Sequence, residues 1–92
     1  MTELLSRLAE ACEQNSSSAS IAKLLLNGEL QCEALSEDAA PDDLPRWADL
    51  QMRLAMWRRV YPRLGKQPAF RSAMAREASA WVKRLQHDDL SV

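Results

Sequence analysis

The sequence predicts an all-α protein, a small bundle of four to five helices that ends in an antiparallel helical hairpin. Leucine and alanine supply 28 of the 92 residues, whereas Val, Ile and Thr together supply five and Gly supplies two. Leucine and alanine favour helix, and the scarce β-branched types favour strand. Apolar residues also recur at intervals of three and four along most of the chain, which is the period of an amphipathic helix. A chain of this length forms one domain without room for a large internal cavity.

Two helices are expected near the N-terminus. Thr2 is a suitable cap for a first helix that ends at about Gln14. Its apolar stripe consists of Leu4, Leu5, Leu8, Ala11 and Cys12. Asn and Ser residues follow and break the pattern, so Ser18 or Ser20 is expected to cap a second helix.

A helix end is expected at Asn27-Gly28, because both residue types accept the left-handed conformation that terminates helices. The sequence then predicts a short third helix over residues 29–37 that places Leu30 and Ala34 inward. Residues 38–43 contain three acids and Pro41 without an apolar period, and they predict an exposed acidic linker. Residues 1–37 thus form an acidic N-terminal helical segment.

Residues 44–88 predict the helical hairpin. Asp43 is a plausible cap and Pro45 suits the first turn of a long helix. One seam on this helix, at spacings of three and four, is formed by Trp47, Leu50, Leu54, Trp57 and Tyr61. Pro62 and Gly65 are expected to end it. Pro68 then opens a last helix whose inward side carries Phe70, Met74, Ala78, Trp81 and Leu85.

The charge is divided between the two halves of the chain. Residues 1–43 carry nine acids and two bases, a net charge of −7, and residues 44–92 carry ten bases and four acids, a net charge of +6. Either the two halves neutralise each other within the fold, or the basic half presents a face to an acidic partner. Nine of the twelve bases are arginines, which favour planar contacts to carboxylate or phosphate.

A second apolar stripe containing Met52 and Met56 lies opposite the aromatic seam of the long helix. Either the N-terminal helices cover it, or it stays partly open and docks a partner or a second copy, since methionine adapts to irregular surfaces. Large flexible apolar residues beside arginines are typical of protein interfaces. The candidate partner-binding residues are therefore Met52, Met56, Arg53, Arg59 and Arg63.

The sequence indicates no enzyme, no cofactor and no metal site. It has a single histidine, no glycine-rich phosphate loop and no nucleophile paired with a base at an interpretable spacing. His87-Asp88-Asp89 is interpreted as a polar helix end, because adjacent helical residues point in different directions. Cys12 and Cys32 are expected to be reduced residues of the core.

The expected function is that of a non-enzymatic adaptor, chaperone-like or inhibitory regulator that binds another protein, with an acidic surface, through helical faces. A homodimer fits the same pattern. A small nucleic-acid-binding regulator that uses the arginine-rich helices is the alternative, as is a subunit of a larger obligate complex. Residues 1–20 lack a basic region followed by an apolar run, and the longest aliphatic run is Leu24–Leu26, so a cytoplasmic protein without a membrane segment is expected.

Overall fold

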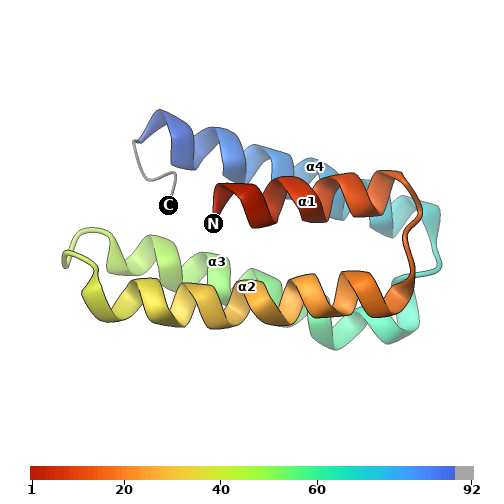
Figure 1. Cartoon of the computed structure of the whole chain (residues 1–92), viewed down its shortest axis with the longest axis horizontal. Coiled ribbons are helices and arrows are strands. Elements are labelled where there is room, and N and C mark those ends of the chain that lie inside the picture. The colour runs from red at the N-terminus through yellow and green to blue at the C-terminus, as the bar shows by residue number, and fades with distance from the viewer. Residues whose placement is uncertain (89–92) are drawn as a thin grey trace.

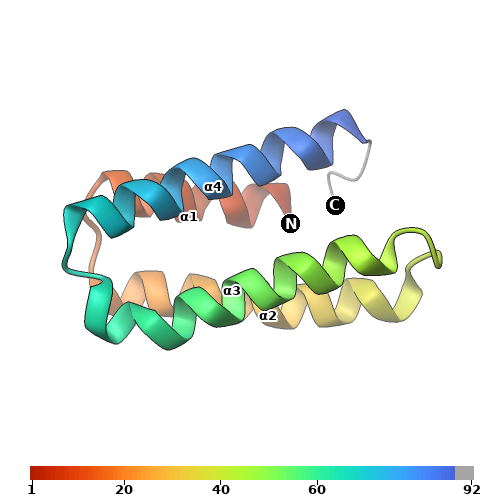
Figure 2. The same ribbon diagram turned by 180° about the vertical axis from the view of Figure 1, so that it is seen from behind.

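The computed structural model describes residues 1–88, which form four helices and no strand. The helices are α1 (Thr2–Glu13), α2 (Ser18–Asp38), α3 (Leu44–Leu64) and α4 (Pro68–His87). They are arranged in two layers, with α1 beside α4 in one and α2 beside α3 in the other (Figures 1 and 2). The expected all-α bundle is confirmed, with four helices.

The core lies between the two layers. The aromatic seam predicted on the long helix is buried along its whole length: Trp47, Leu50, Leu54, Trp57 and Tyr61. Facing side chains from the other helices complete the core, among them Leu5, Leu8, Ile21, Leu25, Met74, Ala78, Trp81 and Leu85. The predicted inward residues of α4 are thus buried too, except for Phe70, which is partly buried. Spacings of three and four residues therefore identified the inner faces of α3 and α4 correctly.

The separate third helix predicted over residues 29–37 is wrong, because α2 continues through Asn27-Gly28 to Asp38. Leu30 and Ala34, which were expected inward, are exposed. Gly28 is buried, and a Cβ atom there would lie 2.9 Å from Leu54 Cδ1 and 3.2 Å from Leu4 Cδ2. Glycine is present at this position because α2, α3 and α1 approach one another closely, not because the helix ends.

The predicted N-caps of the first two helices are shifted by one to three residues, whereas Asp43 is the N-cap of α3 as predicted. Thr2 lies inside α1, whose cap is Met1 without a side-chain hydrogen bond. In α2 the cap is Ser17 rather than Ser18 or Ser20, and its Oγ accepts a hydrogen bond from Ser20 N–H at 3.2 Å. Neighbouring serines are chemically equivalent caps, so composition alone does not choose among them.

Pro62 does not end α3, contrary to expectation. It removes one backbone hydrogen bond, but the helix continues to Leu64, and Gly65 N–H donates to Tyr61 O at 2.7 Å. Gly65 is the C-cap, as predicted, although its φ is −65°. A Cβ atom there would lie 2.6 Å from the Tyr61 ring, so this turn requires glycine for its close approach.

The two last helices are not each other's main packing partners, so the predicted hairpin is not an independent unit. α4 packs most closely on α1, and α3 on α2, while the backbones of α3 and α4 stay farther apart. Cys12 Sγ of α1 lies 3.7 Å from Met74 Sδ of α4, inside the first of these contacts. The first and last helices of the chain therefore lie side by side in one layer (Figure 2).

Both cysteines are free and buried. Burial raises the pKa of the Cys32 thiol to about 12 and also raises the pKa of Cys12. Each thiol therefore fills core space as a neutral group, as the sequence predicted.

The acidic and basic halves meet at specific places. Arg58 of α3 forms a bidentate ion pair with Glu29 of α2, and Arg46 lies 3.9 Å from Asp43 at the start of α3. Glu33 and Glu37 of α2 and Arg59 and Arg63 of α3 remain exposed. Internal pairing thus neutralises part of the charge and leaves the rest at the surface. Among residues 1–88, no helix is sufficiently long and apolar to cross a bilayer.

Candidate functional site

A groove of about 490 Å³ runs between α3 and α4. α3 packs mainly on α2, and α4 packs mainly on α1. The backbones of α3 and α4 are therefore not in close contact, and the groove lies between them. Its lining residues are Asp49, Met52, Arg53, Met56, Glu77, Trp81 and Arg84. The groove thus combines apolar side chains with charges of both signs.

The apolar edge of the groove is formed by Met52 and Met56. Met52 is 70% exposed and Met56 is 39% exposed. They are four residues apart on one side of α3, while Leu50, Leu54 and Trp57 turn the opposite side into the core. The N-terminal helices do not cover these methionines. Exposed methionine beside a groove provides a flexible apolar surface that adapts to different partners.

Three contacts position the charged residues around the groove. Arg53 Nε lies 2.8 Å from Glu77 Oε1, which bridges α3 and α4, and Arg53 Nη1 lies 3.8 Å from Met56 Sδ. On α4 the Arg84 guanidinium lies 4.1 Å from the centroid of the Trp81 ring, as in a cation–π contact. Trp81 itself is buried and forms part of the groove wall.

The five sequence-predicted site residues do not all lie together. Met52, Met56 and Arg53 line the groove. Arg59 and Arg63 are exposed but lie outside its lining. They follow Met52 and Met56 at spacings of three and four, so they extend the same outward stripe of α3 towards its C-terminal end.

Sequence reasoning missed the contribution of α4. Glu77, Trp81 and Arg84 fall at spacings of four and three on one side of this helix. The sequence pattern places Trp81 only in the core, and it does not distinguish Arg84, one turn later, from the other bases of this half of the chain. The signal that could have located this wall is a single acid within a basic helix, opposite an arginine on the preceding helix.

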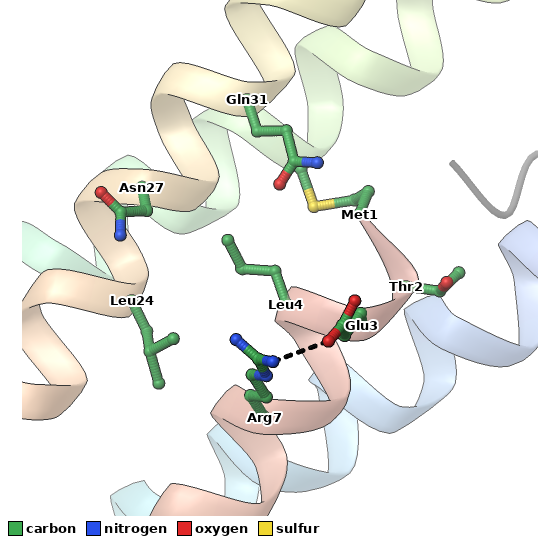
Figure 3. A pocket seen from close by; sticks show the side chains of 8 residues that line it. All are labelled: Met1, Thr2, Glu3, Leu4, Arg7, Leu24, Asn27 and Gln31. Atoms are coloured by element: carbon green, nitrogen blue, oxygen red, sulfur yellow. Dashed lines mark hydrogen bonds and ion pairs between the residues drawn. The ribbon is translucent and has the colours of Figure 1, made fainter.

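A second pocket, of about 410 Å³, lies between α1 and α2 (Figure 3). Its lining residues are Met1, Thr2, Glu3, Leu4, Arg7, Leu24, Asn27 and Gln31. Arg7 and Glu3 pair with each other at 2.7 Å, and Leu4 and Leu24 are partly buried. This pocket therefore offers a partner no exposed large apolar side chain, and its two charged side chains pair with each other, so the α3/α4 groove is the better candidate.

The polar end of α4 carries His87 and Asp88, and Asp89 lies outside the described residues. Asp88 Oδ2 lies 3.2 Å from Arg46 Nη2, so this carboxylate joins the end of α4 to the start of α3. Within residues 1–88, no three His, Cys, Asp or Glu side chains are grouped in a way that could hold a metal ion.

Comparisons with protein families, curated proteins and solved structures gave no match.

Proposed function

We propose that this chain is a non-enzymatic, cytoplasmic regulator, acting as an adaptor, chaperone-like protein or inhibitor, that docks an acidic amphipathic helix of another protein in the α3/α4 groove. The observation that carries the proposal is the exposure of Met52 and Met56 beside the groove between α3 and α4. An amphipathic helix that lays its apolar stripe into such a groove is a common mode of peptide recognition.

Charge supports an acidic partner. The groove lining itself holds two bases and two acids, Arg53, Arg84, Asp49 and Glu77. The excess of positive charge comes from Arg59 and Arg63, which are exposed and continue along the same side of α3. Arginine forms bidentate hydrogen bonds with carboxylates, so acids flanking the apolar stripe of the partner would meet matching donors. Rim charges of this kind mainly set association rate and partner choice, while the methionines supply buried apolar area.

A displayed library of acidic amphipathic helices tests the proposal, with selection against the wild-type chain and against the Met56→Glu variant. Because Met56 is partly exposed, the variant should keep its helical circular dichroism. Wild type should enrich sequences with an apolar stripe flanked by acids, and Met56→Glu should bind them at least about 10-fold more weakly. Ala19→Glu, at an exposed position of α2 outside the groove, is the matched control and should bind them like wild type.

Two outcomes contradict the proposal. One is enrichment of the same sequences by wild type and Met56→Glu, and the other is no enrichment of acidic helices at all. Binding of duplex DNA or RNA with a steep salt dependence, retained in Met56→Glu, would instead favour the nucleic-acid alternative.

A further inference from the structure

A second exposed apolar stripe lies on α2, away from the α3/α4 groove. Leu26 is 44% exposed and Leu30 is 55% exposed, and their spacing of four residues places them on one side of the helix. Leu25, Gly28 and Cys32 turn the other side of α2 into the core. Leu26 and Leu30 therefore lie on the side of α2 (yellow to orange in Figure 1) opposite Gly28, and they face away from both α1 and α3.

The residues around these leucines are arranged symmetrically about Gly28. Leu26 lies two residues before Gly28, and Leu30 lies two residues after it. The exposed residue Lys23 lies five residues before Gly28, and the exposed residue Glu33 lies five residues after it. Six residues away, in both directions, are the exposed alanines Ala22 and Ala34. The stripe thus has the order small, large, large, small, with a base near one end and an acid near the other.

We propose that this stripe is a two-fold symmetric contact between two copies of the chain, in which α2 packs antiparallel on α2 of the second copy. A two-fold axis at the level of Gly28, on the opposite and exposed side of α2, brings Leu26 of each copy to Leu30 of the other. The same axis brings Lys23 of each copy to Glu33 of the other. Self-complementarity of this kind is what an isologous interface requires.

The ion pairs in this arrangement form only between copies. Lys23 and Glu33 are ten residues apart in one helix, which separates them by about 15 Å along its axis. Within one copy they lie beyond the reach of a salt bridge. Lys23 and Glu33 can therefore form salt bridges with Glu33 and Lys23 of a second copy, but not with each other within one helix.

The proposed contact predicts a weak dimer. It is formed by α2 of each copy alone, and one helix pair buries less area than a stable interface of standard size, about 1,600 Å² in total. We expect reversible association at high protein concentration.

Sedimentation equilibrium of the purified chain, up to about 1 mM, tests the contact. The mass should rise from 10.4 kDa towards twice that value with concentration. Lys23→Glu alone and Glu33→Lys alone each create two like-charged pairs per dimer, so each should weaken association at least about 10-fold. An equimolar mixture of the two variants should associate again, because every pair in the mixed dimer has opposite charges.

Charge reversals on the other layer provide the controls. Lys83→Glu on α4 and Glu13→Lys on α1 make the same changes at exposed positions and should leave the mass unchanged. Met56→Glu should also dimerise, which separates this test from that of the groove. A wild-type chain that stays at 10.4 kDa overturns the proposal, as does a dimer that both single variants leave intact or a mixture that fails to associate.

Discussion

The two layers of the bundle expose different surfaces. In the part of the chain that the structure describes, the exposed large hydrophobic side chains all come from α2 and α3: Leu26, Leu30, Leu44, Met52 and Met56. The outer sides of α1 and α4 carry charged and small residues, such as Glu3, Glu10, Arg76, Ala80 and Lys83. Both layers bury their inner faces equally well.

This difference shows which apolar side chains stabilise the fold and which are available to bind another molecule. α1 and α4 direct their large apolar residues inward, as a helix pair does when it faces only water on its outer side. α2 and α3 carry apolar residues on both sides, and only the inner ones contribute to the shared core. The outer apolar residues of α2 and α3 are thus the ones available for contacts with other molecules.

The largest expected effect comes from comparing the inner and outer sides of the α2/α3 layer. Leu54→Ala should lower the free energy of unfolding by about 2 to 5 kcal/mol, because Leu54 is fully buried and its removal leaves a cavity. Leu30→Ala should change it by less than about 0.5 kcal/mol, since Leu30 faces solvent. Urea unfolding followed by circular dichroism at low protein concentration measures both. Equal losses would contradict the assignment of the two sides.

Gly28→Ala should destabilise the protein by about 1 to 2 kcal/mol, because its new Cβ would crowd Leu54 Cδ1 in the closely packed core. In a Leu54→Ala background the crowding by Leu54 disappears and only the 3.2 Å approach to Leu4 Cδ2 remains. The higher helix propensity of alanine, worth up to about 1 kcal/mol, should then offset most or all of the cost of Gly28→Ala. The same urea experiment on the four chains gives the coupling between the two positions. Additive effects would show that Gly28 is not required for contact with Leu54.

Arg84→Gln should cost about 0.5 to 1 kcal/mol through loss of the contact with Trp81. Arg76→Gln, on the outer side of the same helix, removes the same charge without an aromatic neighbour among the contacts of the structure. Its free energy of unfolding should therefore stay closer to that of wild type. Thermal unfolding of the two variants at equal salt makes the comparison, and a larger loss for Arg76→Gln would contradict it.

The buried thiols predict a change confined to alkaline pH. Unfolding exposes Cys32, whose pKa then falls from about 12 to its ordinary value near 9. The unfolded state therefore releases a proton that the folded state keeps, and stability should fall as pH rises from about 9 to 12. Comparison of Cys32→Ala with wild type over this range isolates the effect, because the variant should show a shallower decline in the free energy of unfolding.

Sequence patterns predicted the inner faces of the helices well, because burial follows the helical period. Trp47, Leu54 and Trp57 are buried as their spacing indicated. The continuity of α2 could not be predicted in this way, since Gly28 is equally compatible with a helix end and with a close tertiary contact. Only the position of Leu54 across from it decides between the two.

Some of the residues that line the candidate groove were predicted from the sequence, and others were not. Met52, Met56 and Arg53 were identified from α3 alone, because one helix carries their whole pattern. Glu77 and Arg84 were not, because their place in the groove depends on how far α4 lies from α3. That distance follows from the preference of α4 for α1, which depends on the packing of complete faces and not on local spacing.

The pairing of the first helix with the last has a consequence for the order of events during synthesis. α2 and α3 are neighbours in sequence, so their contact can form while the chain is still being made. α1 packs chiefly on α4, and its buried leucines therefore lack their main cover until the ribosome has released residues 68–87. A nascent chain that stalls at the turn before α4 would leave Leu5 and Leu8 without the helix that normally shields them, and it would be a substrate for chaperones or proteases.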